Sequence, residues 1–280
     1  VYDKYHGGFS GEPKFPPHNS LLFLANFVNF DQTSEIKKIL EQTLDVMSMR
    51  GLHDHLQGGF YRYCTDSNWT IPHFEKMLYD QAMMLMVYSC GYKVLKKNEY
   101  KLIVEKIIKC LDETFRNLDV FYSGHDADTN HEEGLTYLWD YNEVKKNVNL
   151  EKFSEVYEIS KEGNFEGRNH LIKKKNEFFK DEERLLEIRK KRVQPFVDKK
   201  ILTSWNALVG IGLIYAYRYC DLDVFDKAEN LFRWIMKNHV KNKKLVHGSI
   251  DGILQEYGFL EDYASMLVLA TYIYEETGLF

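Results

Sequence analysis

The 280-residue chain has a formal net charge of −5, and its five prolines are few for its length. The negative charge argues against a general nucleic-acid-binding protein, which would need a basic surface. The scarcity of proline favours long helices. No stretch has the composition of a flexible linker, so we expect a single domain over residues 1–280.

Helical periodicity dominates the chain, and an apolar helix is repeatedly followed by a more charged one. This alternation indicates an inner row and an outer row of helices. Paired glycines at Gly7-Gly8 and Gly58-Gly59 predict turns that deliver the chain to helices. The predicted helices are His18–Phe30, Ser34–Arg50, His73–Leu95, Glu99–Asn117, Asn142–Ser160 with an interruption, Asn176–Arg192, Ser204–Tyr219, Val224–Val240 and Leu260–Thr277.

The helical pattern breaks between Val120 and Trp139. Phe121–Ser123 and Thr136–Trp139 are rich in aromatic residues and flank an acidic loop, so they predict short strands. We therefore expect a small β insertion at about residues 120–139.

Cysteine usage gives no sign of a redox centre. Cys64, Cys90, Cys110 and Cys220 are scattered, without a Cys-x-x-Cys pair, so we expect four free thiols and a cytoplasmic protein. No signal peptide is visible. The most apolar stretch, Ala207–Tyr217, is shorter than the ~20 residues that span a bilayer.

Several motifs follow one another along nearly the whole chain. The longest is Gly58–Gln81, GGFYRYCTDSNWTIPHFEKMLYDQ. The others are GEPKFPP (Gly11–Pro17), DADTNHEEG (Asp126–Gly134), GNFEGRN (Gly163–Asn169), LTSWNAL (Leu202–Leu208) and GFLEDYA (Gly258–Ala264). In this order they resemble the spermatogenesis-associated, thioredoxin-like protein family. Members of that family pair a thioredoxin-like domain with an α/α-barrel domain related to N-acylglucosamine 2-epimerases and six-hairpin glycosidases.

The resemblance implies an all-α fold, an α/α toroid of the six-hairpin glycosidase-like type. A complete toroid of this kind has twelve helices, whereas the sequence predicts eight or nine. We therefore expect an incomplete toroid. Further helix pairs or a partner, such as a thioredoxin-like domain, would cover its apolar flank.

Polar residues gather where the predicted inner helices begin. The catalytic candidates are His55, His73, Glu75 and Arg62, because histidine transfers protons near neutral pH and a carboxylate can orient it. The substrate-binding candidates are Asp54, Trp69, Lys76, Asp80, Asp126, Asp128, Trp205, Asn206, Glu261, Asp262 and Tyr263. We expect His55, His73, Trp205 and Glu261 to line one cavity.

Each candidate also has a structural interpretation. The histidines can form hydrogen bonds with local carbonyl groups. Glu75 and Lys76, the charged residues near His73, can take part in an intrahelical ion pair. Trp205 can pack in a core behind a Ser204 helix cap, and the acidic loop can be a solvated turn. A zinc site at His53, His55, His73 and Glu75 is a further alternative, because these residue types bind zinc. We expect neither a metal nor another cofactor.

The sequence thus predicts recognition of a carbohydrate or polyol in a central pocket, with possible epimerase or isomerase chemistry. Epimerisation needs two proton-transfer groups on opposite sides of one carbon, for which His55 and His73 are candidates, with Arg62 polarising a carbonyl. Glycoside hydrolysis is the competing enzyme class; Glu75, Asp126 and Glu261 could supply its two carboxylates. A non-enzymatic module that serves a thioredoxin-like domain is the third hypothesis, favoured if the pocket is purely apolar.

Overall fold

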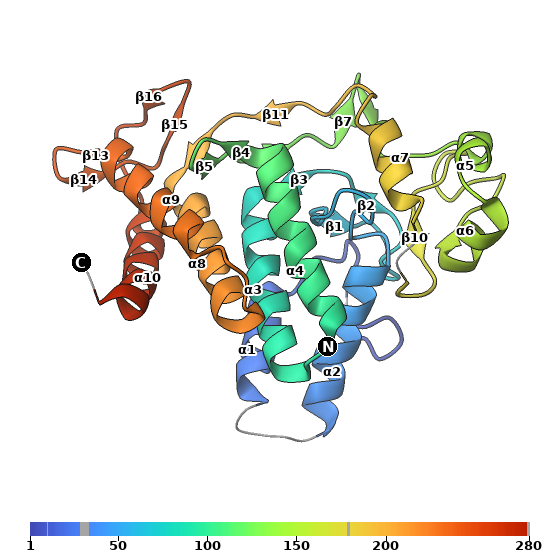
Figure 1. The fold of residues 1–280 in the computed structure, drawn as a ribbon, viewed down its shortest axis with the longest axis horizontal. Coiled ribbons are helices and arrows are strands. Elements are labelled where there is room, and N and C mark those ends of the chain that lie inside the picture. Colours follow the sequence, from blue (N-terminus) through green and yellow to red (C-terminus); the bar gives the residue numbers. More distant parts are fainter. Residues whose placement is uncertain (10, 29–33, 178–179, 279–280) are drawn as a thin grey trace. The chain divides into compact units, whose positions relative to one another are not determined.

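The computed structural model describes residues 1–9, 11–28, 34–177 and 180–278 (Figure 1). These residues form two compact units. Unit 1 comprises Val1–Lys76 with His125–Phe196, and unit 2 comprises Met77–Gly124 with Val197–Phe280. How the two units associate, and so whether the chain is a single domain, stays a prediction.

Unit 2 is built from two rows of helices. α8 packs against both α3 and α10, whereas α4 packs on α3 and α9 packs on α8 (Figure 1). The helices are α3 (Leu78–Leu95), α4 (Asn98–Cys110), α8 (Thr203–Cys220), α9 (Phe225–Asn238) and α10 (Leu260–Thr277). A π-helical turn, η1 (Leu111–Phe115), follows α4.

Burial separates the two rows as the sequence pattern predicts. α3 and α8 are buried over most of their circumference, whereas α4 and α9 bury only one face. Gly212 of α8 allows close contact with α3, because a Cβ there would lie 3.0 Å from Leu85 Cδ2 and 3.1 Å from the Ala82 carbonyl oxygen. The alternation of apolar and amphipathic helices therefore corresponds to inner and outer positions within this unit.

Short antiparallel ladders connect the helices of unit 2. β4 (Arg116–Asn117) pairs with β5 (Val120–Phe121), and β13 (Val240–Lys241) pairs with β14 (Lys244–Leu245). β12 (Ile201–Leu202), β15 (Gly248–Ile250) and β16 (Ile253–Leu254) form a three-stranded sheet in which Ser249 faces both Ile201 and Leu254. The remaining short strands outside unit 1 or at its boundary are β3 (Lys76–Met77), β6 (Gly124–His125) and β11 (Val197–Asp198).

Unit 1 has shorter helices and more loops. Its helices are α1 (His18–Phe27), α2 (Ser34–Met49), α5 (Tyr141–Asn147), α6 (Leu150–Val156) and α7 (Glu182–Arg189). α1 packs on α2, and α5 packs on α7. Its antiparallel pairs are β1 (Tyr63–Cys64) with β2 (Pro72–His73), β7 (Asp128–Thr129) with β8 (Glu132–Glu133), and β9 (Tyr157–Glu158) with β10 (Ile172–Lys173).

An aromatic core in unit 1 joins two of the sequence motifs. Tyr61, Phe74 and Tyr137 are buried together, and the rings of Phe74 and Tyr137 stack with centroids 5.8 Å apart. Gly134, with φ 71°, lies so close that a Cβ on it would be 2.6 Å from the Phe74 ring. Gly134, the last residue of the DADTNHEEG motif, is therefore required because any side chain there would clash with the Phe74 ring.

Several predicted boundaries differ from the structure. The helix expected from His73 begins at Leu78, because Cys64 and Tyr63 pair with Pro72 and His73 in a β-ladder. Thr136–Trp139 forms no strand, although Trp139 makes an isolated bridge to Asn169. Strands also occur well outside residues 120–139, so helices dominate a fold that is not purely α. The predicted end of the first helix, at Phe30, lies outside the described residues. So do residues 178–179 of the predicted helix Asn176–Arg192.

All four cysteines are buried and free. Among the helices that the structure describes, none combines the length and apolarity that crossing a membrane requires.

Two buried histidines, His170 and His239, and the half-buried His18 make stability depend on pH. Burial lowers the pKa of His18, His170 and His239 to about 4 in each case. The unfolded chain therefore takes up protons near pH 6.5 that the folded chain does not bind. Above pH 6.5 the protonation of these histidines does not affect the free energy of unfolding. As the pH falls from 6.5 toward 4, each of them lowers that free energy by about 1.4 kcal/mol per pH unit.

Urea unfolding at pH 7 and pH 5 checks this expectation. The His239→Gln variant provides a comparison, because it removes one of the three titrating groups. We expect a smaller pH dependence in the variant, even though it loses the hydrogen bonds to Thr203 and Ser249. Equal unfolding free energies at the two pH values in the wild type would show that these imidazoles are not held neutral.

Candidate functional site

The β1–β2 hairpin places His73 at the centre of a polar cluster in unit 1. Tyr63 lies opposite His73 in the ladder, and their rings stack with centroids 5.1 Å apart and planes at 19°. Nδ1 of His73 lies 2.7 Å from Oε1 of Glu133, which belongs to β8. On the other side, Nε2 of His73 lies 4.0 Å from Oε2 of Glu75. The imidazole is thus held between two carboxylates from different segments.

Arg62 completes this group, which we call the His73 cluster: Arg62, Tyr63, His73, Glu75 and Glu133. Nη1 of Arg62 donates to Oε2 of Glu75 at 2.8 Å, and the Arg62 N–H donates to the Glu75 carbonyl oxygen. The side chains of His73 and Arg62 are 29% and 40% exposed, so a ligand from solvent can reach them. Three of the four catalytic candidates therefore lie together.

The cluster has the elements of acid–base chemistry. A carboxylate bonded to one ring nitrogen of a histidine orients the ring and fixes which nitrogen faces a ligand. The other nitrogen then faces the second carboxylate, whose charge is shared with a guanidinium. This arrangement can exchange a proton with a hydroxyl or carbonyl group near neutral pH.

A buried ionic group formed by Asp54, Lys76 and Arg189 lies in the same unit. Asp54 receives two parallel bonds from Arg189, at 2.9 and 2.8 Å, and a third from Nζ of Lys76 at 2.7 Å. All three side chains are at most 4% exposed. Burial alone would raise the pKa of Asp54, but Arg189 and Lys76 together hold that pKa far below its usual range. Asp54 is therefore ionised in the folded protein.

Tyrosine rings enclose this ionic group. Lys76 Nζ lies 5.3 Å from the centroid of Tyr61 and 5.5 Å from that of Tyr137, and the Arg189 guanidinium lies 5.3 Å from Tyr137. Such cation–π contacts stabilise buried cations. Asp54 and Lys76 thus join the loop after α2 to the aromatic core, and their predicted contact with a substrate stays a prediction. Sequence reasoning missed Arg189, which stands in a helix rich in lysine and arginine and carries no distinguishing signal.

His55 contacts residues outside the His73 cluster. It is 3% exposed, and its Nδ1 lies 3.2 Å from Nδ1 of His53. Its ring also meets Tyr157 in a T-shaped arrangement, with centroids 5.8 Å apart. Within the described residues, the ligand atoms of His53, His55, His73 and Glu75 do not gather into a metal-binding set.

The other candidates of unit 1 occupy different environments. Trp69 is fully buried, and its indole N–H donates to the carbonyl oxygen of His6 at 3.1 Å. Asp126 and Asp128 are both exposed, and Asp126 accepts the backbone N–H of Asp128. A cavity of about 310 Å³ in this unit, lined by Thr136, Glu143, Arg168, Arg192 and their neighbours, includes none of the predicted site residues.

In unit 2, Asn206 has a clear structural role. It is fully buried; its Oδ1 accepts the N–H of Phe121, and its Nδ2 donates to the carbonyl oxygens of Phe121 and Leu202. Asp80 is also buried in α3. Trp205 is half-buried, and its ring meets Tyr79 edge-on at 4.9 Å.

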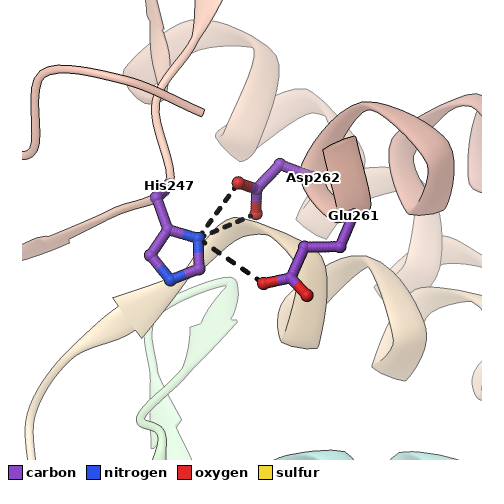
Figure 2. A group of neighbouring side chains, drawn as sticks. All are labelled: His247, Glu261 and Asp262. Atoms are coloured by element: carbon purple, nitrogen blue, oxygen red, sulfur yellow. Dashed lines mark hydrogen bonds and ion pairs between the residues drawn. The ribbon is translucent and has the colours of Figure 1, made fainter. Parts of the chain in front are cut away.

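The start of α10 brings Glu261 and Asp262 to His247, a residue that the sequence did not single out (Figure 2). Nδ1 of His247 lies 3.0 Å from Oδ2 of Asp262 and 3.9 Å from Oε1 of Glu261. Tyr263 accepts the backbone N–H of Leu245 on its hydroxyl. The predicted cavity draws on residues of both units and stays a prediction.

Comparison with known proteins identifies relatives along nearly the whole chain. No protein-family model matches it. An uncharacterized Caenorhabditis elegans protein is 29% identical over 99% of this chain and 46% of its own length. Spermatogenesis-associated protein 20 of Rattus norvegicus is 28% identical over 94% of this chain and 41% of its own length. The chain thus spans less than half the length of these relatives.

Solved structures with a similar fold include glycoside hydrolases. A family 76 glycoside hydrolase from a bovine Bacteroides thetaiotaomicron strain aligns over 99% of this chain and 47% of its own, with a TM-score of 0.56 and 13% identity. An α-1,6-mannanase of Salegentibacter in complex with α-1,6-mannotetrose aligns over 100% and 61%, with a TM-score of 0.54 and 10% identity. The sequence comparison confirms the resemblance that the motifs carry, and the structural comparison shows a fold similar to that of family 76 glycoside hydrolases: over nearly its whole length, the chain is similar to spermatogenesis-associated protein 20.

Proposed function

We propose that this chain binds a carbohydrate or a related polyol, and that the His73 cluster is its contact site. The observation that carries this proposal is the position of the His73 imidazole, 2.7 Å from Glu133 and 4.0 Å from Glu75, in a partly exposed group. Sugar hydroxyls both donate and accept hydrogen bonds. The cluster offers carboxylate acceptors, a guanidinium donor and an imidazole that can do either.

An aromatic surface accompanies these polar groups. Tyr63 stacks on His73, and the centroid of Phe15 lies 4.7 Å from that of Tyr63. Phe15 is 51% exposed and belongs to the GEPKFPP motif. Pyranose rings present apolar C–H faces to such surfaces, so an aromatic platform beside hydrogen-bonding groups suits a sugar better than a purely charged ligand.

Epimerase or isomerase chemistry at this site would use His73 as a proton-transfer group, with Arg62 available to polarise a carbonyl. The orienting bond from His73 Nδ1 to the Glu133 carboxylate supports such a role. A second proton-transfer group would have to act on the other face of the reacting carbon. His55 is the candidate that the sequence offers for it.

Glycoside hydrolysis is the second candidate function. Its support is the fold shared with family 76 glycoside hydrolases, together with the two carboxylates on either side of His73. Hydrolysis requires one carboxyl group that protonates the leaving oxygen and one carboxylate that acts as nucleophile or base. Glu75 and Glu133 are the residues that we assign to these roles in that case.

We further propose that the helices form part of an α/α toroid, with α3, α8 and α10 in its inner row. Leu260, Tyr263, Leu267, Val268 and Tyr274 leave an apolar face of α10 exposed, with Leu260 85% and Leu267 69% accessible. Soluble proteins rarely leave a continuous face of this kind in water. Because the relatives are more than twice as long, further helix pairs are the occupant that we propose for this face.

Thermal melts with a ligand panel test the binding proposal. The panel contains common mono- and disaccharides and α-1,6-mannotetrose, the ligand held by the Salegentibacter mannanase. A sugar that binds only the folded state raises the melting temperature in a concentration-dependent way. Products with inverted configuration at one carbon indicate epimerisation, and shortened oligosaccharides indicate hydrolysis.

A further inference from the structure

His247, Glu261 and Asp262 form a compact group of potential metal ligands in unit 2 (Figure 2). His247 lies in the segment between β14 and β15, whereas the two carboxylates belong to the first turn of α10. One ligand atom from each residue lies within 4.8 Å of the other two. Figure 2 shows both carboxylates turned toward the same ring nitrogen, Nδ1.

Among the residues that the structure describes, no lysine or arginine forms an ion pair with this group. Throughout the described residues, His247 is the sole ion-pair partner of both Glu261 and Asp262. Asp262 is fully buried, and its carboxylate accepts the backbone N–H groups of Ser204, at 3.0 Å, and Phe259, at 2.8 Å. These bonds and the start of α10 offset part of the buried charge. Two adjacent carboxylates facing one imidazole still leave a site where a cation would be favourable.

We propose that His247, Glu261 and Asp262 bind a divalent transition-metal ion, with Zn²⁺ as the representative. One imidazole nitrogen and two carboxylate oxygens form a ligand set that borderline metals such as zinc accept. Zinc bonds of about 2.0–2.2 Å in tetrahedral geometry separate neighbouring ligand atoms by about 3.4 Å. The distances from Nδ1, 3.0 Å to Asp262 and 3.9 Å to Glu261, lie on either side of that value.

The surroundings hold two ligands and leave the third adjustable. Asp262 is fixed by its two backbone bonds, and the His247 ring meets Phe259 at 4.7 Å. The Glu261 side chain is 61% exposed, so it can move by the few tenths of an ångström that coordination requires. Because the Glu261 side of the group is exposed, three protein ligands leave the fourth tetrahedral position to water, the pattern of open rather than closed zinc sites. On binding, the Nδ1 proton of His247 passes to solvent.

Calorimetric titration of the chelator-treated, untagged chain with Zn²⁺ tests the proposal. We expect one equivalent to bind, and Glu261→Gln and His247→Ala each to weaken binding by at least about tenfold. Glu261→Gln is the more informative variant, because it keeps the side-chain volume at an exposed position and leaves the Asp262 bonds intact. Glu256→Gln, at another exposed glutamate of unit 2, is the matched control and should bind as the wild type does.

A second readout separates metal binding from a hydrogen-bonded pair. Zn²⁺ should raise the melting temperature of the wild type and of Glu256→Gln, and raise that of Glu261→Gln by clearly less at the same Zn²⁺ concentration. Unchanged affinity in Glu261→Gln and His247→Ala would overturn the proposal, as would the absence of any Zn²⁺ binding by the wild type. If the melting temperature of His247→Ala lies below that of the wild type by the same amount with and without Zn²⁺, the group is a structural His–Asp pair and the proposal is wrong. None of these outcomes depends on sugar binding.

Discussion

Replacing Asp54 by asparagine is expected to destabilise the folded chain by about 3–5 kcal/mol, because it leaves two buried cations without their anionic partner. Arg189 and Lys76 donate three bonds of 2.7 to 2.9 Å to the Asp54 carboxylate. Asparagine keeps the shape of the side chain but turns an amide N–H₂ toward at least one of these cations. The tyrosine rings beside them cannot supply the missing charge.

Denaturant unfolding of Asp54→Asn and of Asp128→Asn measures this effect. Asp128 is an exposed aspartate of the acidic loop, so the same chemical change there should alter stability by no more than about 0.5 kcal/mol. A loss below about 1 kcal/mol for Asp54→Asn would mean that water or rearrangement compensates the two cations. The buried ionic group would then not be a determinant of the fold.

Replacing His73 by alanine is expected to abolish sugar binding with little loss of stability. The bond from His73 to Glu133 joins groups that are 29% and 40% exposed, and such surface pairs contribute only about 0.2–1 kcal/mol. Removing the imidazole, however, removes the group that the two carboxylates orient. Glu75→Gln separates charge from shape, since it keeps the volume but weakens the bond from Arg62.

His6→Ala is the matched control for His73→Ala. His6 is an exposed histidine 3.3 Å from Asp3, so it reproduces a surface histidine–carboxylate pair outside the His73 cluster. We expect its melting temperature to rise with sugar as in the wild type. A His73→Ala variant that melts several degrees lower and keeps its sugar-induced shift would assign His73 a structural role instead.

The periodicity of the sequence predicted the helices well where burial alone decides them. α10 begins and ends at the predicted residues, α2 ends one residue earlier than predicted, and α8 extends one residue further at each end. The start of α3 could not be predicted in the same way. Pro72 and His73 suit a helical first turn by local propensity, but pairing with Cys64 and Tyr63 holds them in a ladder. That tertiary pairing overrides local preference and leaves no trace in the spacing of apolar residues.

Only those parts of the candidate site that lie close together in the sequence could be predicted. Arg62, His73 and Glu75 lie near one another in the chain, so their proximity followed from the motif itself. Glu133 and Arg189 reach their partners from distant segments, and His247 is brought to α10 only by the β14–β15 region. A single sequence records which residues are present but not which distant segments meet, so these three side chains required the structure.

Titration calorimetry with the sugar panel measures binding at the His73 cluster directly and assumes no reaction. We expect at least one sugar to bind the wild type and His6→Ala with saturable heat, and His73→Ala to give none under the same conditions. If no sugar binds the wild type, or if His73→Ala binds equally well, the His73 cluster is not a sugar site.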